Sequence, residues 1–180
     1  MKLLLHICCA PCIAAPFREL AEHADVTGFF YNPNIHPLLE FRKRLRAVEV
    51  FQEQEKFPVI YHREYGLHDF LRRIGPDTPG RCAVCYKMRI DATAAAAHEN
   101  GFDAFTTSLL FSRHQGHQTI KAIADEASRR EGVEFYYTDL RHMVEESQAI
   151  ARKRSLYRQQ YCGCIFSEYE RYAGRFKAEA

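Results

Sequence analysis

The residues of this sequence best suited to chemistry are seven cysteines, gathered in three short clusters. The clusters are Cys8, Cys9 and Cys12, then Cys82 and Cys85, then Cys162 and Cys164. Thiolate sulfur binds soft metals and iron–sulfur clusters, and pairs of thiols exchange electrons through disulfides. A single free cysteine is often only a small buried hydrophobe. Three thiols within five residues favour metal binding or redox chemistry instead.

The first two clusters together offer four sulfur ligands for one metal centre. Cys8 and Cys9 stand where an apolar strand gives way to a predicted helix, whose N-terminus favours the thiolate form. Cys82 and Cys85 are spaced to hold one metal, although this pair alone also fits half a zinc site, a redox dithiol or chance. With Cys8 and Cys9, the pair is enough for a 4Fe-4S cluster.

The third cluster has a different spacing, with only Gly163 between Cys162 and Cys164. Two cysteines this close form a small, strained disulfide ring, and strained disulfides are the reducible, catalytic kind. The spacing favours a redox-active pair. The alternative, two further metal ligands, stays open because spacing alone rarely separates the two uses.

Length and composition are those of an ordinary folded domain. The chain has 180 residues, of which 47% are hydrophobic and 27% charged, so we expect one domain over residues 1–180. The first apolar run is too short for a signal peptide, and no stretch approaches the length of a membrane span. We therefore expect a cytoplasmic protein without a membrane partner. Because that compartment is reducing, we do not expect its cysteines to form a structural disulfide framework.

The net charge of +2 is too small to indicate a nucleic-acid-binding protein by itself, so any basic surface must be local. Two basic runs stand out, one containing Arg42 and Arg44 and the other containing Arg152 and Arg154. Taken alone, each run is more typical of a solvated helix face.

Apolar runs and helical spacings alternate along the chain. They predict strands over 2–7, 26–31, 59–61, 102–110 and 133–137, and helices over 10–23, 37–56, 66–74, 84–100, 117–130 and most of 144–172, with an interruption near 162–164. This alternation predicts a Rossmann-like α/β fold, with a mostly parallel sheet and helices on both faces. Ligands bind beyond the carboxyl ends of such strands, where Cys8 and Cys9 are expected.

Six segments together resemble the cobalamin-independent epoxyqueuosine reductases of the QueH type, over most of the chain. They are residues 6–12, 30–35, 40–44, 81–86, 106–112 and 156–167. The resemblance implies reduction of epoxyqueuosine to queuosine at the wobble position of tRNA. It also implies a fold like that of the adenine nucleotide α-hydrolases.

The resemblance further implies a role for each cysteine pair. By this carry-over Cys8, Cys9, Cys82 and Cys85 hold a 4Fe-4S cluster, and Cys162 and Cys164 form a redox-active disulfide. It allows an additional iron, with Asp139 as the only acidic match nearby. The implied partners are tRNA bearing epoxyqueuosine and an electron donor of unknown identity.

A tRNA substrate gives the two basic runs a use, because Lys and Arg make most contacts to a nucleic-acid backbone. We expect Arg42, Arg44, Arg152 and Arg154 to bind tRNA. Two other functions remain as alternatives. An ATP-using tRNA thiolase would need a glycine-rich phosphate loop after the first strand, which residues 8–12 lack. A metal-binding tRNA adaptor would show no redox change.

Overall fold

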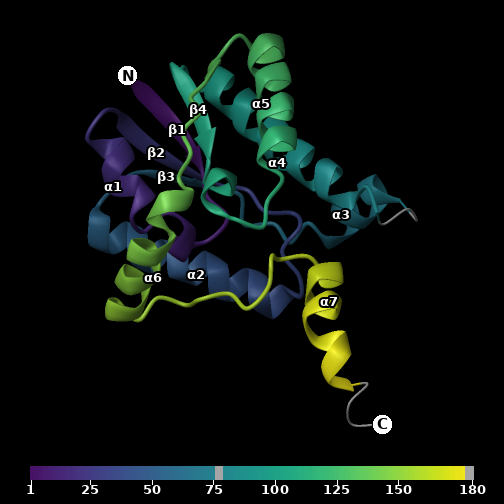
Figure 1. Ribbon diagram of the computed structural model, residues 1–180. Coiled ribbons are helices and arrows are strands. Elements are labelled where there is room, and N and C mark those ends of the chain that lie inside the picture. Colours follow the sequence, from purple (N-terminus) through teal and green to yellow (C-terminus); the bar gives the residue numbers. More distant parts are fainter. Residues whose placement is uncertain (76–78, 177–180) are drawn as a thin grey trace.

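The computed structural model describes residues 1–75 and 79–176, and its centre is a five-stranded sheet (Figure 1). The strands are β1 (Lys2–His6), β2 (Asp25–Phe30), β3 (Val59–Tyr61), β4 (Ala104–Thr107) and β5 (Glu134–Phe135). They lie in the order β3-β2-β1-β4-β5, and each neighbouring pair is parallel. The predicted α/β fold with a parallel sheet is confirmed.

The helices of the described residues are α1 (Pro16–Ala21), α2 (Leu38–Glu55), α3 (Leu67–Ile74), α4 (Arg81–Glu99), α5 (His117–Glu131), α6 (Val144–Lys153) and α7 (Ile165–Phe176). Short 3-10 turns cover Ala10–Cys12, Ser108–Phe111 and Arg141–Met143. Residues 76–78, between the helices predicted over 66–74 and 84–100, fall in a segment where we expect a break, and they lie outside the described residues.

Helices cover both faces of the sheet. Successive side chains of a strand point to opposite faces, and β1 divides its leucines accordingly. Leu3 and Leu5 pack in a core with residues of α1, α2 and α6, whereas Leu4 packs with residues of α4 and α5. The strand order reverses at β1, which has β2 on one side and β4 on the other. Such a reversal opens a crevice at the carboxyl ends of the two strands.

Two elements near this crevice are shorter than predicted. The helix expected over 10–23 is a 3-10 turn followed by α1, because Pro16, the first residue of α1, has no N–H to donate to a preceding turn. The strand expected over 102–110 ends at Thr107. The Thr107 side chain accepts a hydrogen bond from the Leu109 N–H, which caps the 3-10 turn that follows.

The C-terminal part of the chain also departs from the prediction. α6 ends at Lys153, and the interruption expected near 162–164 extends over residues 154–164, which we call the C-terminal arm. The arm runs beside α2 before α7 extends away from the sheet (Figure 1). α4 begins at Arg81 and not at 84, so the second cysteine cluster is helical.

Among residues 1–75 and 79–176, no helix has the length and apolar character needed to cross a membrane.

Candidate metal and redox site

The first cysteine cluster lies at the crevice between β1 and β4. The Cys8 N–H donates to the Ser108 hydroxyl oxygen at 3.1 Å, and that hydroxyl in turn lies 3.3 Å from the Cys8 sulfur. Ser108 directly follows β4, and the pairing of β1 and β4 ends with His6 opposite Thr107, so both residues lie at the same edge of the sheet. The sheet itself therefore positions the first thiol.

Cys12 joins Cys8 and Cys9, which the prediction had chosen without it. The three sulfurs lie within 4.8 Å of one another, and they form the one group of three or more metal-ligating residues found in the described part of the chain. The 3-10 turn folds the chain back on itself, so that Cys9 and Cys12 are paired as a disulfide, with Cα atoms 5.6 Å apart. The CxxC spacing of Cys9 and Cys12 was a signal for this pairing.

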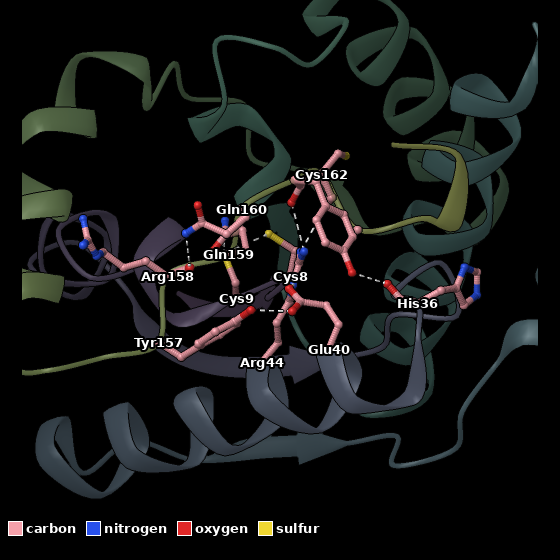
Figure 2. A network of polar contacts seen from close by, with 12 residues as sticks. Cys8, Cys9, His36, Glu40, Arg44, Tyr157, Arg158, Gln159, Gln160 and Cys162 are labelled. Carbon is pink, nitrogen blue, oxygen red and sulfur yellow. Dashed lines mark hydrogen bonds and ion pairs between the residues drawn. The ribbon is translucent and has the colours of Figure 1, made fainter. Parts of the chain in front are cut away.

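The C-terminal arm closes over this cluster through Gln159 (Figure 2). The Gln159 side-chain amide donates to the Cys9 sulfur at 3.0 Å and to the Cys12 sulfur at 3.4 Å. Its buried Oε1 atom has no hydrogen-bond partner among the described residues. Such an orphaned polar atom is typical of a site that awaits a ligand or water. No sequence feature had singled out Gln159 by itself.

The second cysteine cluster occupies the first turns of α4. Cys82 and Cys85 are three residues apart on this helix, so they share a face. Cys82 is exposed and Cys85 is buried. Burial raises the pKa of the Cys85 thiol to about 12, which keeps it protonated at neutral pH. A bound metal cation displaces such a proton.

Arg89 lies directly behind this cluster. Its side chain is 2% exposed, its Nε donates to the Cys85 carbonyl oxygen at 3.0 Å, and its Nη2 donates to the Cys85 sulfur at 3.1 Å. Burial works against the charged form, yet the negative charges that Cys85, Cys162 and Cys8 carry when ionised outweigh it and raise the pKa of Arg89. The guanidinium therefore lies within electrostatic range of a cysteine from each cluster.

The third cysteine cluster is held by its backbone (Figure 2). Arg44 donates to the carbonyl oxygens of Tyr161 at 3.0 Å and Cys162 at 2.8 Å. The His36 N–H donates to the Gly163 carbonyl at 2.8 Å, and the Tyr161 hydroxyl donates to the His36 carbonyl at 2.6 Å. Four hydrogen bonds thus fix a segment that has no regular secondary structure.

The two thiols of the third cluster have different surroundings. Cys162 is exposed and accepts a hydrogen bond from the Gln115 amide at 3.2 Å. Cys164 is buried, and its sulfur accepts from the Ser167 N–H at 3.4 Å. Both are free thiols in this structure.

Two adjoining cavities bring the three clusters together. The smaller, of about 180 Å³, is lined in part by Cys82, Cys85, Cys162 and Cys164. The larger, of about 640 Å³, is lined in part by Cys8, Cys12, Cys162, Gln115 and Gln159. Cys162 and Gln115 line both. Every cysteine but Cys9 therefore lines one or both of these cavities.

The predicted tRNA-binding arginines divide into surface and buried residues. Arg42 and Arg152 are exposed. Arg154 is partly exposed and forms an ion pair with Glu55 at 2.5 Å. Arg44 is 1% exposed. The expectation that Arg44 faces tRNA needs correction, because its guanidinium is occupied inside the protein.

Two further polar groups have structural partners. Asp139 is bound by the Arg141 guanidinium, whose hydrogen bonds hold the pKa of that carboxyl well below its usual range. Asp139 lines neither of the two cavities. Burial lowers the pKa of His6 to about 3. The neutral ring lies between the Thr107 hydroxyl and the Tyr31 carbonyl, so His6 pins β1 to its neighbours and holds no acidic proton for catalysis.

The residues around the cavities suit an anionic sulfur-bound metal group. Thiols from three clusters converge on them, a buried guanidinium faces those thiols, and amide and hydroxyl donors point at the sulfurs. Fold and site together define a parallel α/β protein with thiol-lined cavities near the carboxyl ends of its central strands and a cysteine group that could hold a metal.

Comparison with known proteins then identifies the family. The family model described as epoxyqueuosine reductase QueH matches residues 3–170, and this chain belongs to that family. The resemblance predicted from its motifs is confirmed.

Named members of the family are similar over nearly the whole chain. A protein of Dehalococcoides mccartyi named epoxyqueuosine reductase QueH is 41% identical over 172 residues, covering 95% of this chain and 94% of that protein. A protein of the same name from Thermotoga maritima is 31% identical over 180 residues, covering 94% and 91%. One from Histophilus somni is 34% identical over 183 residues, covering 92% and 72%.

Proposed function

We propose that this protein reduces epoxyqueuosine in tRNA to queuosine, because the family and its named relatives are described as epoxyqueuosine reductases. The reaction takes up two electrons and two protons, converts the epoxide to an alkene, and releases the oxygen as water. The observation that carries this proposal is the convergence of cysteines from three distant clusters on two adjoining cavities. Such an enzyme is an oxidoreductase of tRNA modification.

Cys8, Cys9, Cys82 and Cys85 would hold a 4Fe-4S cluster. The strand end supplies the first two thiols and the N-terminus of α4 supplies the other two. When bound, the cluster supplies one-electron transfers that side chains alone cannot provide. For Cys9 to take part, its disulfide with Cys12 must first be reduced.

Cys162 and Cys164 would form the redox-active pair. Oxidation of two thiols to a disulfide releases two electrons and two protons, which equals the demand of the reaction. Cys162 borders both cavities, so it lies between the substrate space and the second cysteine cluster. The hydrogen bonds from Arg44 to the Cys162 carbonyl and from the His36 N–H to the Gly163 carbonyl hold the backbone of the pair in place while the sulfurs react.

The larger cavity would receive the modified base. It is lined by several side-chain amides and hydroxyls, which suit a polar ring system and its hydroxyl groups. The amide lining residues are Gln115, Gln148, Gln159 and Gln160. An anticodon base must leave its stack to reach such a cavity.

The tRNA backbone would contact Arg42, Arg152 and Arg154. Beside Arg42 lies a groove of about 450 Å³ between α2 and the C-terminal arm, lined also by Lys43 and Tyr157. We further propose that residues 1–180 act as one domain in the cytoplasm, where the tRNA substrate and reduced thiols coexist. The electron donor and the additional iron stay predictions.

Anaerobic reconstitution tests the cluster. We expect iron and sulfide in the parent protein and their loss when Cys82 and Cys85 are both replaced by serine. Cys12→Ser is the matched control, because it removes a thiol close to Cys8 and Cys9 that is not one of the four proposed ligands. Full iron and sulfide in the Cys82/Cys85 variant would reject this ligand set.

Replacement of Cys162 and Cys164 by serine tests the redox pair. Cluster content should stay near that of the parent protein, while turnover of epoxyqueuosine tRNA collapses. Cluster loss in this variant would move the two thiols into the ligand set. Unimpaired multiple turnover would remove them from the mechanism.

Charge reversal tests the tRNA surface. Arg42→Glu with Arg152→Glu should weaken tRNA binding and lower its salt dependence by about one phosphate contact per residue. Arg72→Glu, a reversal at an exposed arginine on α3, is the control. If both variants bound tRNA equally well, the two basic runs would be ordinary solvated helix faces without a role in tRNA binding.

A further inference from the structure

Arg89 is a buried cation whose polar contacts include no carboxylate. The hydrogen bonds of its guanidinium within the described residues go to the carbonyl oxygen and the sulfur of Cys85. The guanidinium also lies 6.0 Å from the centre of the Tyr86 ring. No ion pair joins it to an acidic side chain in residues 1–75 and 79–176. Its positive charge is therefore not neutralised by any permanently charged group described here.

Such a charge is expensive to bury. Removing a cation from water without an anion beside it carries a large desolvation cost, and proteins normally avoid it by pairing. At 2% exposure the guanidinium has little water to compensate it. Arginine cannot escape by losing its proton at neutral pH. An anion must therefore approach it in the working protein.

The nearest candidates for that anion are thiols. The Cys85 sulfur is 3.1 Å from Nη2, and Cys8 and Cys162 lie within electrostatic range of the guanidinium. A protonated thiol carries no charge, whereas a metal-bound thiolate does. A 4Fe-4S cluster with four cysteine ligands carries a net negative charge, which would neutralise Arg89 when it is bound.

We propose that Arg89 is the buried counter-charge of the sulfur site, positioned by α4 to balance the negative charge of the cluster and its thiolates. This inference rests on the proposed cluster. Reduction adds one more negative charge to the cluster, and a nearby cation stabilises that charge. Arg89 is therefore a positioning residue that favours the loaded site and raises its reduction potential.

The test compares Arg89→Met, Arg89→Gln and Arg89→Lys in the full-length protein, reconstituted without oxygen. A redox titration followed by electron paramagnetic resonance gives the midpoint potential of the cluster. Loss of the charge should shift the midpoint negative by at least tenfold in the one-electron equilibrium constant, which is 59 mV. Arg89→Lys keeps the positive charge, so its midpoint should lie close to that of the parent protein. Arg72→Met, the same charge loss at an exposed position on α3, should leave the midpoint unchanged.

Unfolding by urea gives a second measurement that does not depend on activity. Arg89→Met should lower the unfolding midpoint more in the loaded protein than in the reduced, cluster-free protein, because only the loaded site contains the compensating charge. A role in packing alone would lower both midpoints equally.

The outcomes are distinct. A parent-like potential together with equal destabilisation of both forms would overturn the counter-charge role. Cluster loss in Arg89→Met and Arg89→Gln that Arg89→Lys prevents would support it, and cluster loss in all three variants would overturn it in favour of a shape requirement. If the parent protein itself bound no cluster, the proposed function would fail, and this inference with it.

Discussion

Two fully buried arginines each donate a hydrogen bond to the side chain four residues earlier on the same helix, but the two acceptors differ in charge. Arg44 on α2 donates to Glu40, four residues earlier, at 2.7 Å. Arg89 on α4 donates to Cys85, also four residues earlier, at 3.1 Å. The first partner is a carboxylate with a permanent charge, but the second is a thiol that is charged only when ionised or bound to metal. The buried charge of Arg44 on α2 is therefore neutralised without a ligand, whereas the buried charge of Arg89 on α4 is not.

The pair of Arg44 and Glu40 on α2 serves as a fixed support for the C-terminal arm. Besides Glu40, Arg44 holds the carbonyl oxygens of Tyr161 and Cys162. The Tyr157 hydroxyl donates to the other oxygen of Glu40, which closes the network (Figure 2). Every partner in this network is available whether or not the sulfur site is loaded. The comparison predicts that damage here affects folding, and damage at Arg89 affects loading.

The largest expected effect is from breaking the Arg44 pair. Arg44→Met leaves the Glu40 carboxylate buried without its cation, which should lower the free energy of unfolding by about 3–5 kcal/mol. Urea unfolding should give the same loss in the loaded and cluster-free proteins. Adding Glu40→Gln should recover part of it, because the unpaired charge is gone. A loss seen only in the loaded protein would contradict the comparison.

A smaller effect should come from acid, through His36. Burial lowers the pKa of His36 to about 4, below the value of about 6.5 expected in the unfolded chain. Its neutral ring lies between the Pro33 carbonyl and the Ile165 N–H. Because the unfolded chain takes up the proton first, the stabilisation is present above pH 6.5 and is lost as pH falls toward 4.

At pH 5 this loss should be about 2 kcal/mol relative to neutral pH. Unfolding of the cluster-free protein at pH 7 and pH 5 measures it. His36→Gln should remove this part of the pH dependence and leave the part that buried His6 contributes, whereas His98→Gln, at an exposed site on α4, should change neither part. Equal pH dependence in the parent protein and His36→Gln would mean that His36 does not provide it.

The same contrast explains what the sequence could predict. The strand-ending position of Cys8 follows from a local pattern, an apolar run that stops at a cysteine, and the structure bears it out at the β1–β4 crevice. The burial of Arg44 does not follow from any local pattern. It depends on carbonyl groups 117 and 118 residues away, so a run of basic residues looked like a surface.

The sulfur site shows both cases within a few residues. The place of Cys12 follows from a tight turn that its spacing from Cys9 permits, and so it could have been anticipated. The contact between Gln159 and those sulfurs could not, because the C-terminal arm brings it back across about 150 positions. Ligand types are thus encoded locally, and the donors that surround them are supplied by tertiary structure.

The smallest expected effect compares a neutral hydrogen-bond donor at one pair of sulfurs with a full charge at another sulfur of the site. Gln159 offers the Cys9 and Cys12 sulfurs a neutral N–H donor, at 3.0 and 3.4 Å, where Arg89 offers Cys85 a full charge. Gln159→Met should change the free energy of unfolding by less than about 1 kcal/mol, because it removes a donor together with a buried acceptor that has no partner. Hydrogen bonds to cluster sulfurs raise the reduction potential, so the midpoint should shift negative, but by less than in Arg89→Met. A redox titration of both variants in parallel makes the comparison. A larger shift in Gln159→Met would mean that local hydrogen bonds outweigh the buried charge in setting the potential, and the contrast between the two arginines would lose its consequence for electron transfer.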